Sequence, residues 1–199
     1  KQLAHEAGYV FYIDPGPLPG TSRAYWGPEI KMGAPQPALN TDMDAHTNVE
    51  SLSFSLDGLA KKTVIMFTLD PITRKIPIPV PVPDINPIHP PLGLRQTPPA
   101  KVSFATDTTR LSTTELLKRA FGIMMQSADA ISGSGSLNVA SYGHVLRSRM
   151  LVGVRGAGIA YDGMYYVDSV THSIKRGEYK QNFQRSRDGL ISQTPVVMP

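Results

Sequence analysis

Histidine is the side chain best suited to bind a metal or move a proton near neutral pH, and this 199-residue sequence has five of them. They are His5, His46, His89, His144 and His172. No two have the spacing of metal ligands, and there is no cysteine to complete a zinc site or form a disulfide. Asp42, Asp44 and His46 alternate and could line one side of a strand as a metal site, but a solvated loop is the favoured interpretation. We therefore expect no metal and no other cofactor.

Motifs for catalysis are also lacking. The glycine-rich stretch 153–158 (Gly-Val-Arg-Gly-Ala-Gly) invites comparison with a phosphate-binding loop. Its spacing differs from the dinucleotide and Walker motifs, and a hairpin is predicted where those motifs need a helix. Glycines at the bends of a tight barrel are the favoured explanation. No Gly-x-Ser-x-Gly elbow is present, and the sequence gives no separation for a glycosidase pair such as Glu29 and Asp44. We predict no enzyme activity and no small-molecule substrate.

Basic residues gather near the end of the chain, interleaved with Tyr179 and Phe183. They are Lys175, Arg176, Lys180, Arg185 and Arg187. Aromatic and basic residues together are also typical of a surface for single-stranded nucleic acid. The formal net charge is only +4 and is scattered along the chain, so we expect no nucleic-acid binding. The alternatives are a charged outer face and a protein interface. We favour an assembly interface formed by Arg176, Tyr179, Lys180, Arg185 and Arg187.

Two turn signals place these residues on a β-meander. Asp162-Gly163 and Arg176-Gly177 each separate stretches of alternating side chains, and glycine accepts the positive φ of a tight hairpin turn. They predict three consecutive antiparallel strands, at 159–162, 164–174 and 178–187. Such a meander would form the wall of a barrel or a sandwich.

Further strands are predicted in the first third of the chain. Residues 9–13 and 23–26 are interpreted as a strand and its partner, separated by a proline-rich turn. Residues 48–56 have the cleanest alternation and predict a half-buried strand. Its two faces are Leu52, Phe54 and Leu56 on one side and Ser51, Ser53 and Ser55 on the other. A loop at 57–61 favours a hairpin between this strand and another at 62–68.

One helix is predicted near 112–131. Ser112 and Glu115 form a capping box at its start. An apolar stripe follows at steps of three and four, which we expect to pack in the core. It comprises Leu117, Phe121, Met124, Ala128 and Ile131. The helix is expected to stop at the Ser-Gly-Ser-Gly of 132–135.

Short strands are predicted after this helix, at 136–140, 144–149 and 151–155. A helix followed by short antiparallel strands suits a small barrel with a helical plug or lid. A second, short helix is predicted at the start of the chain, where Gly8 would cap its C-terminal end.

The chain has 18 prolines and 17 glycines, which favours a β-rich fold with many turns. Residues 76–83 alternate proline with branched apolar residues, which allows polyproline II or an edge strand but not a central strand. We interpret 70–110 as an extended connector lying on the body or on a neighbouring subunit. The alternative is a ligand for a proline-binding module. The predicted fold is mainly β (α+β), with a β-rich segment and short helix at 1–69, this connector, and a helix plus antiparallel tube-like barrel at 111–199.

Six motifs, three near each end of the chain, share their pattern with one known family. They are Leu3-Ala-x-x-Ala-Gly-Tyr-Val-Phe-Tyr12, Ala24-Tyr-Trp-Gly-Pro-Glu29, Asn48-Val-Glu-Ser-Leu-Ser-Phe-Ser55, Leu151-Val-Gly-Val-Arg-Gly-Ala-Gly158, Tyr161-Asp-Gly-x-Tyr-Tyr-Val-x-Ser-Val-Thr-His172 and Gly177-Glu-Tyr-Lys-Gln181. Over nearly the whole chain they resemble the phage late control D family, the baseplate hub of contractile phage tails and contractile injection systems. That family is similar to the hub half of the type VI spike protein. The chain begins at Lys1 in what reads as the middle of a helix, so we expect a fragment or processed chain that matches the C-terminal half or more of such a hub.

The resemblance implies a structural role, without catalysis in this portion. A hub of this family is a homotrimer whose subunits are each similar to two tail-tube barrels, so that it presents a pseudo-six-fold ring to the tail tube. Its other end holds the spike, through which any membrane contact would be indirect. The implied partners are further copies of the chain, the tail tube protein and the spike protein. The implied particle is assembled in the bacterial cytoplasm and is a virion tail or a secreted contractile device. The alternative function is a tail component that binds or hydrolyses peptidoglycan.

Overall fold

The computed structural model describes residues 3–4, 8–70, 77–82, 90–105, 113–125 and 129–193. Strands dominate this described part, which confirms the predicted mainly β fold. The chain forms two compact units, each drawn from separate stretches of sequence. The first unit comprises 1–30, 62–89 and 99–127, and the second comprises 31–61, 90–98 and 128–199. Each of the predicted segments, 1–69, 70–110 and 111–199, therefore contributes to both units.

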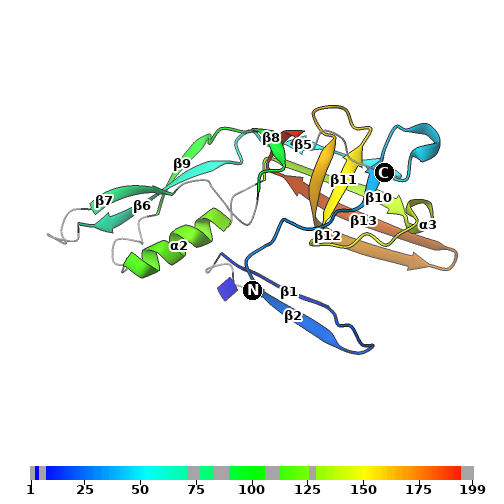
Figure 1. The fold of residues 1–199 in the computed structure, drawn as a ribbon, viewed down its shortest axis with the longest axis horizontal. Helices are drawn as coiled ribbons and strands as arrows, with labels where there is room; N and C mark the ends of the chain where they lie inside the picture. The colour runs from blue at the N-terminus through cyan, green and yellow to red at the C-terminus, as the bar shows by residue number, and fades with distance from the viewer. Residues whose placement is uncertain are drawn as a thin grey trace. The chain divides into compact units, whose positions relative to one another are not determined.

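A seven-stranded sheet forms the second unit and curls into a half-barrel (Figure 1). Its order is β3-β11-β12-β13-β10-β4, with β5 also beside β10. All neighbours are antiparallel except β3 and β11. The strands are β3 (Gln36–Asn40), β4 (Ser51–Leu52), β5 (Ser55–Leu56), β10 (Ile131–Asn138), β11 (Leu151–Arg155), β12 (Gly163–Lys175) and β13 (Glu178–Arg187). Two short helices, η1 (Asp44–His46) and α3 (Val139–Tyr142), lie between them in sequence.

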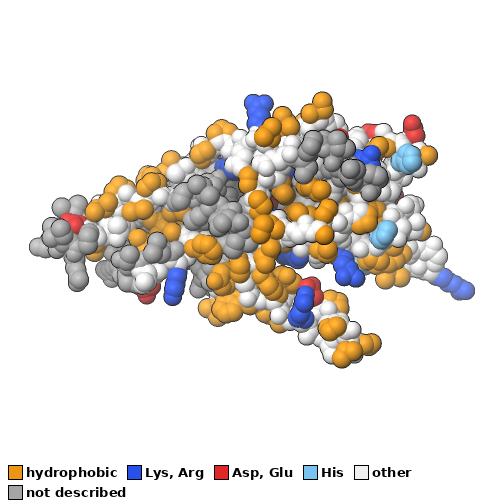
Figure 2. All heavy atoms as spheres, viewed as in Figure 1, with side chains coloured by type: hydrophobic (Ala, Val, Ile, Leu, Met, Phe, Trp, Pro, Cys, Tyr) orange, Lys and Arg blue, Asp and Glu red, His pale blue; other side chains and the backbone are white. Residues whose placement is uncertain are grey.

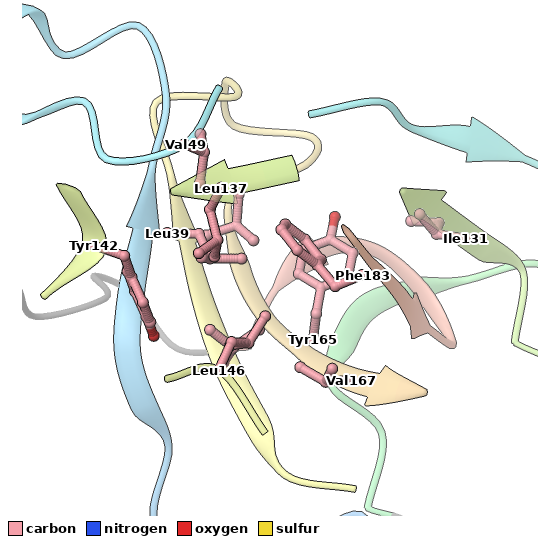
Figure 3. Packing of buried hydrophobic residues seen from close by; sticks show 11 residues of the cluster. Leu39, Val49, Ile131, Leu137, Tyr142, Leu146, Tyr165, Val167 and Phe183 are labelled. Atoms are coloured by element: carbon pink, nitrogen blue, oxygen red, sulfur yellow. The ribbon is translucent and has the colours of Figure 1, made fainter. Parts of the chain in front are cut away.

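The hydrophobic core of the second unit draws on strands that are far apart in the sequence (Figure 3). Its buried members are Leu39, Val49, Ile131, Leu137, Tyr142, Leu146, Val152, Val154, Tyr165, Val167 and Phe183. Gln181 shares this interior, where its amide donates to the Leu146 carbonyl and accepts from the Leu146 N–H, both at 2.9 Å. The Gln181 side chain thereby satisfies both backbone hydrogen-bonding groups of Leu146, a residue outside the strands.

A small two-stranded sheet completes the second unit, formed by β8 (Gly93–Gln96) and β14 (Gly189–Ser192). One carboxylate oxygen of Asp188 accepts from the backbone N–H groups of Leu92 and Gly93, both at 2.9 Å. The Asp188 side chain, which directly follows β13, therefore fixes the start of β8.

The first unit contains a two-stranded ribbon, a three-stranded sheet and a helix (Figure 1). The ribbon pairs β1 (Val10–Pro15) with β2 (Ser22–Gly27), as predicted for 9–13 and 23–26. The sheet has the order β7 (Pro77–Val82), β6 (Lys62–Leu69), β9 (Lys101–Ala105), and α2 (Thr113–Met125) packs against β6 and β7. Leu3 and Ala4 are helical, and Gly8 has the positive φ of a C-terminal cap, with the Tyr9 N–H bonded to the Ala4 carbonyl at 2.7 Å.

The predicted helix near 112–131 is confirmed as α2, but it is shorter than expected. Ile131 does not belong to it: this residue is fully buried in β10, opposite Arg187. The Ser-Gly-Ser-Gly of 132–135 is part of the same strand and not a helix stop. Phe121 is 36% exposed, so its prediction as a core residue is wrong. Ser112, Ala128 and the side chains of Leu117 and Met124 lie outside the described residues.

The predicted meander is confirmed for two of its three strands. β12 and β13 match 164–174 and 178–187, and Lys175 lies opposite Glu178 across the Arg176-Gly177 turn. The strand at 159–162 is wrong, because β11 is the neighbour of β12 and Val154 lies opposite Gly163. Residues 156–162 are a longer loop. The Asp162 carboxylate holds it closed by accepting from the Ala157 N–H at 2.7 Å.

The serine-rich strand at 48–56 is confirmed as β4 and β5, with Leu52 and Phe54 half-buried and the three serines exposed. Its predicted hairpin with 62–68 is wrong, because β6 pairs with β7 and β9 in the first unit. The strand predicted at 144–149 is also wrong. Asn138 ends β10 by capping α3, accepting from the Ala140 N–H at 3.0 Å, and a loop leads on to β11.

The prediction that the alternating prolines allow an edge strand but not a central strand is confirmed for residues 77–82. β7 lies at an edge of its sheet and pairs only with β6 among the described strands. The described residues of segment 70–110 include β7, β8 and β9.

Gly163 is a position where a larger side chain should disturb the fold. It is buried with φ at +122°, and a Cβ atom would lie 2.3 Å from the Ser192 side chain. We expect Gly163→Ala to lower the free energy of unfolding in urea by about 1–3 kcal/mol. Gly177→Ala is the control, because Gly177 also has positive φ but has nothing within 4 Å of the added atom. Equal losses for the two variants would show that close packing at Gly163 does not matter.

Candidate assembly surface

The β12–β13 hairpin carries the residues predicted to form an interface. Lys175 and Glu178 are the last pair before a two-residue turn in which Gly177 has φ at +81°. Arg176 is exposed in this turn and Ile174 is 72% exposed beside it. A single exposed apolar side chain is ordinary on a protein surface, so Ile174 by itself does not mark a contact site.

Tyr179 and Lys180 are held in place on this hairpin. The Tyr179 hydroxyl lies 2.7 Å from Nδ1 of His172 on the opposite strand. The Lys180 ammonium forms ion pairs with Glu50 at 3.0 Å and Glu178 at 3.2 Å. The hydrogen bonds that Lys180 donates to the carboxylates of Glu50 and Glu178 raise its pKa. His172 is thus hydrogen-bonded.

Arg185 and Arg187 lie in the interior of the second unit, at 1% and 0% exposure. The prediction that they belong to an exposed interface is therefore wrong. Side chains alternate along a strand, and these two arginines share the face of Phe183, which points into the core. The interface prediction continues with Arg176, Tyr179 and Lys180 alone.

The Arg185 guanidinium is enclosed by aromatic rings. Its carbon lies 4.4 Å from the ring centre of Phe54, 5.3 Å from that of Tyr165 and 5.8 Å from that of Phe183. It donates to the backbone carbonyls of Ser134 at 3.2 Å and Ser53 at 3.1 Å. No carboxylate of the described residues forms an ion pair with it. Burial lowers its pKa to about 10. The charge is compensated by the ring faces and the backbone carbonyls around it.

Arg187 is held in the same way, mainly by backbone carbonyls. It donates to the carbonyls of Gly189 at 2.6 Å, Asp162 at 2.9 Å and Ala160 at 2.7 Å, and stacks 4.5 Å from the ring centre of Tyr165. Burial lowers its pKa. One side chain thus ties the 156–162 loop to the end of β13.

Two glycines make room for this cluster. A Cβ on Gly133 would lie 2.3 Å from the Ser53 carbonyl and 3.2 Å from the Arg185 guanidinium. A Cβ on Gly135 would lie 2.5 Å from the Phe183 ring. The alternating glycines of β10 are therefore required by the side chains opposite them.

Near the β12–β13 turn the other face of the same strands carries Lys180 and Glu178, and beyond them it is covered by neutral polar side chains, of which the sequence indicated only the serines at 51–55. They are Ser51, Ser53, Ser55, Ser132, Ser134, Ser136, Ser169, Thr171, Ser173, Asn182 and Gln184. Hydroxyls bridge neighbouring strands, at 2.8 Å between Ser51 and Ser136 and at 2.9 Å between Ser53 and Ser134. The signal was the serine at every second position in 51–55 and again in 132–136. This face lacks the aromatic and arginine anchors of most interfaces.

The remaining candidate residues do not come together in one site. Asp44 and His46 are exposed on η1, and no group of three or more histidine or acidic residues in the described part of the chain could hold a metal ion. Gly156 and Gly158 have positive φ in the loop after β11, and no helix begins there. No described helix is long and apolar enough to cross a membrane. Figure 2 shows basic side chains dispersed over the visible face and not gathered into one patch.

No protein-family model and no curated protein matches the chain. Solved structures do match, among them two tail proteins. The tail protein from Neisseria meningitidis MC58 superposes with a TM-score of 0.59 at 13% identity, over 95% of this chain and 53% of that one. The 43 kDa tail protein of prophage MuSo2 from Shewanella oneidensis gives 0.55 at 13%, over 94% of this chain and 50% of that one.

The chain shares the fold of these two tail proteins. It spans about half the length of each. The half-barrel and the β12–β13 hairpin described above are thus parts of a fold that known tail proteins use.

The buried position of Arg185 can be tested against the exposed Arg176. We expect Arg185→Ala to lower the free energy of unfolding by about 3 kcal/mol, since it removes two hydrogen bonds from a charged donor and its contacts with three rings. Arg176→Ala should change it by less than about 0.5 kcal/mol. Urea unfolding of both variants measures this, and similar small effects would contradict an interior Arg185.

Two buried phenols should titrate late. Burial raises the pKa of Tyr142 to about 12, and it raises that of Tyr165 to about 12 despite the opposing charges of Arg187 and Arg185. In a titration followed by phenolate absorbance, we expect Tyr142 and Tyr165 to ionise only near pH 12. Tyr142→Phe and Tyr165→Phe should each remove part of that late step. An unchanged late step in both variants would refute the assignment.

Proposed function

We propose that this chain is a structural component of a phage tail or related contractile injection system, within the baseplate hub that joins the tail tube to the central spike. The shared fold along 95% of the chain is the observation that carries the tail assignment. The six family motifs support the hub position. In this role the chain works through contacts with other subunits and not through catalysis.

An open strand edge supports assembly as its task. β11 pairs with β12 only from Gly163 to Tyr166, and the Val167 N–H and carbonyl bond to Met150 and Arg149. Beyond that point no described strand lies on this side of β12, so 170–174 form an edge. Counting back from the Lys175–Glu178 pair at the turn, the backbone groups of Val170, His172 and Ile174 point away from β13. Such an edge is a template for another strand.

The opposite edge of the same sheet matches it in chemistry. The stretch 51–56, which contains β4 and β5, presents serines on one face and Leu52, Phe54 and Leu56 on the other. β12 has Ser169, Thr171 and Ser173 on the hydroxyl face, and Val170, His172 and Ile174 on the core face. If β12 of one subunit paired with β4 and β5 of the next, the hydroxyl face of one sheet would continue the hydroxyl face of the other. The apolar faces would be continuous in the same way.

A contact between two different edges is head-to-tail, and it closes into a ring when the rotation allows. This agrees with the homotrimer that the hub resemblance implies, with the tail tube protein and the spike protein on either side. Arg176, Tyr179 and Lys180 sit on the hairpin beside this edge and would contribute to the same interface.

The oligomeric mass tests this mode of assembly. We expect light scattering over a concentration series to give a trimer of 21.6 kDa chains. Ile174→Pro should shift it to the monomer, because proline removes an outward N–H that the next strand needs. The hairpin should survive, since that N–H does not bond to β13.

Ser173→Ala is the matched control, since it keeps every backbone donor of the edge and should leave the trimer intact. The circular dichroism spectra of the two folded variants should be similar, whereas Ile174→Pro should melt at a lower temperature because the stabilising contact between subunits is lost. A monomer at every concentration, or an Ile174→Pro trimer as stable as the original, would contradict edge pairing.

A further inference from the structure

One edge of the sheet in the first unit is closed by proline. β7 can donate hydrogen bonds only from Ile78, Val80 and Val82, because the residues between them are Pro77, Pro79 and Pro81. An antiparallel ladder needs donors from both strands, so these N–H groups serve the pairing with β6. The outer edge of β7 then presents carbonyls without N–H groups. It cannot pair with a further strand in the usual way.

The other edge of this sheet, formed by β9, keeps its backbone hydrogen-bond donors. β9 is parallel to β6, and Lys101 to Phe104 all retain their N–H groups. No described strand lies on the far side of these residues. The sheet can therefore extend beyond β9 but not beyond β7.

Apolar side chains flank this open edge. Val102 is 56% and Phe104 59% exposed, on the face that also carries Ile65, Phe67 and the three prolines of β7. Phe104 stacks on Phe67 with ring centres 6.1 Å apart. Hydrophobic side chains are visible over this part of the surface (Figure 2). The opposite face buries Met66 and Val82. An exposed aromatic beside an open edge is what folded proteins usually avoid unless something pairs there.

The charges at the start of β9 indicate which kind of side chain a pairing strand would carry there. Lys62 and Lys101 are directly opposite each other, both exposed, and no carboxylate of the described residues forms an ion pair with either. Like charges in this position are unfavourable. A carboxylate on a third strand, next to Lys101, would relieve the repulsion.

We propose that the edge of β9 binds an extended segment of a partner protein by strand addition. The segment carries an acidic residue beside Lys101 and apolar residues beside Val102 and Phe104. Main-chain hydrogen bonds supply much of the affinity, and alternate side chains supply selectivity, as in other complexes formed by strand addition. This site is separate from the β12 edge and does not depend on the proposed function.

The probe is a pair of synthetic peptides, acetyl-Thr-Glu-Val-Thr-Val-Thr-amide and the reversed sequence, which test parallel and antiparallel addition. We expect one of them, at millimolar concentration, to shift the backbone amide signals of Lys101 to Phe104 in the nuclear magnetic resonance spectrum of the whole chain. Signals of β7 should stay in place. A peptide with proline for its central threonine should bind much more weakly, because it lacks a donor.

Charge exchange makes the test specific. Lys101→Glu should weaken binding of the glutamate peptide up to about fivefold, the size expected of one cross-strand charge pair, and should strengthen binding of the same peptide with lysine in place of glutamate. The proposal is overturned if no peptide shifts these signals, if the shifts map elsewhere, or if charge exchange has no effect. It is also overturned if the signals of β9 change with the concentration of the chain alone, which would identify a second copy as the occupant.

Discussion

The half-barrel depends on one buried cation. Arg185 fills the space between β13, β10 and the junction of β4 with β5, and three aromatic rings surround its guanidinium. Because a buried charge without partners is costly, the neighbouring chain must supply acceptors. The carbonyls of Ser134 and Ser53 do so, and Gly133 leaves room for them to approach. The register of the edge strands is thus coupled to a single side chain in the middle of the sheet.

The chain treats the edges of its sheets in different ways. β7 removes its outward donors with alternating prolines, whereas β12 and β9 keep theirs and place Ile174 or Phe104 beside them. An unpaired edge with apolar neighbours favours association. Where broad faces are neutral and polar, as on the serine-covered face, specificity has to come from such edges. The assembly that we propose would therefore use strand edges and turns.

Local signals in the sequence predicted the elements that depend on neighbouring residues. The Arg176-Gly177 hairpin and the alternation of Leu52 and Phe54 with serines needed only turn chemistry and a period of two. Asp162-Gly163 misled because the Asp162 side chain closes a longer loop, and a close approach to Ser192 is what requires the glycine. That approach joins residues from separate strands, which no local pattern records.

The arginines show why charge is a poor guide to exposure in a sheet. Arg185 and Arg187 fall on the same face as Gln181 and Phe183, so strict alternation would have placed all four inside. Their charge argued for the surface, since arginine is rarely buried unless it is paired. The pairing here is with ring faces and backbone carbonyls of β10, the loop at 156–162 and the end of β13, and these partners come together only in the folded sheet. In this sheet alternation and charge give opposite predictions for Arg185. The glycines at alternate positions of β10 favour burial, because they leave the space that a large side chain on the neighbouring strand fills.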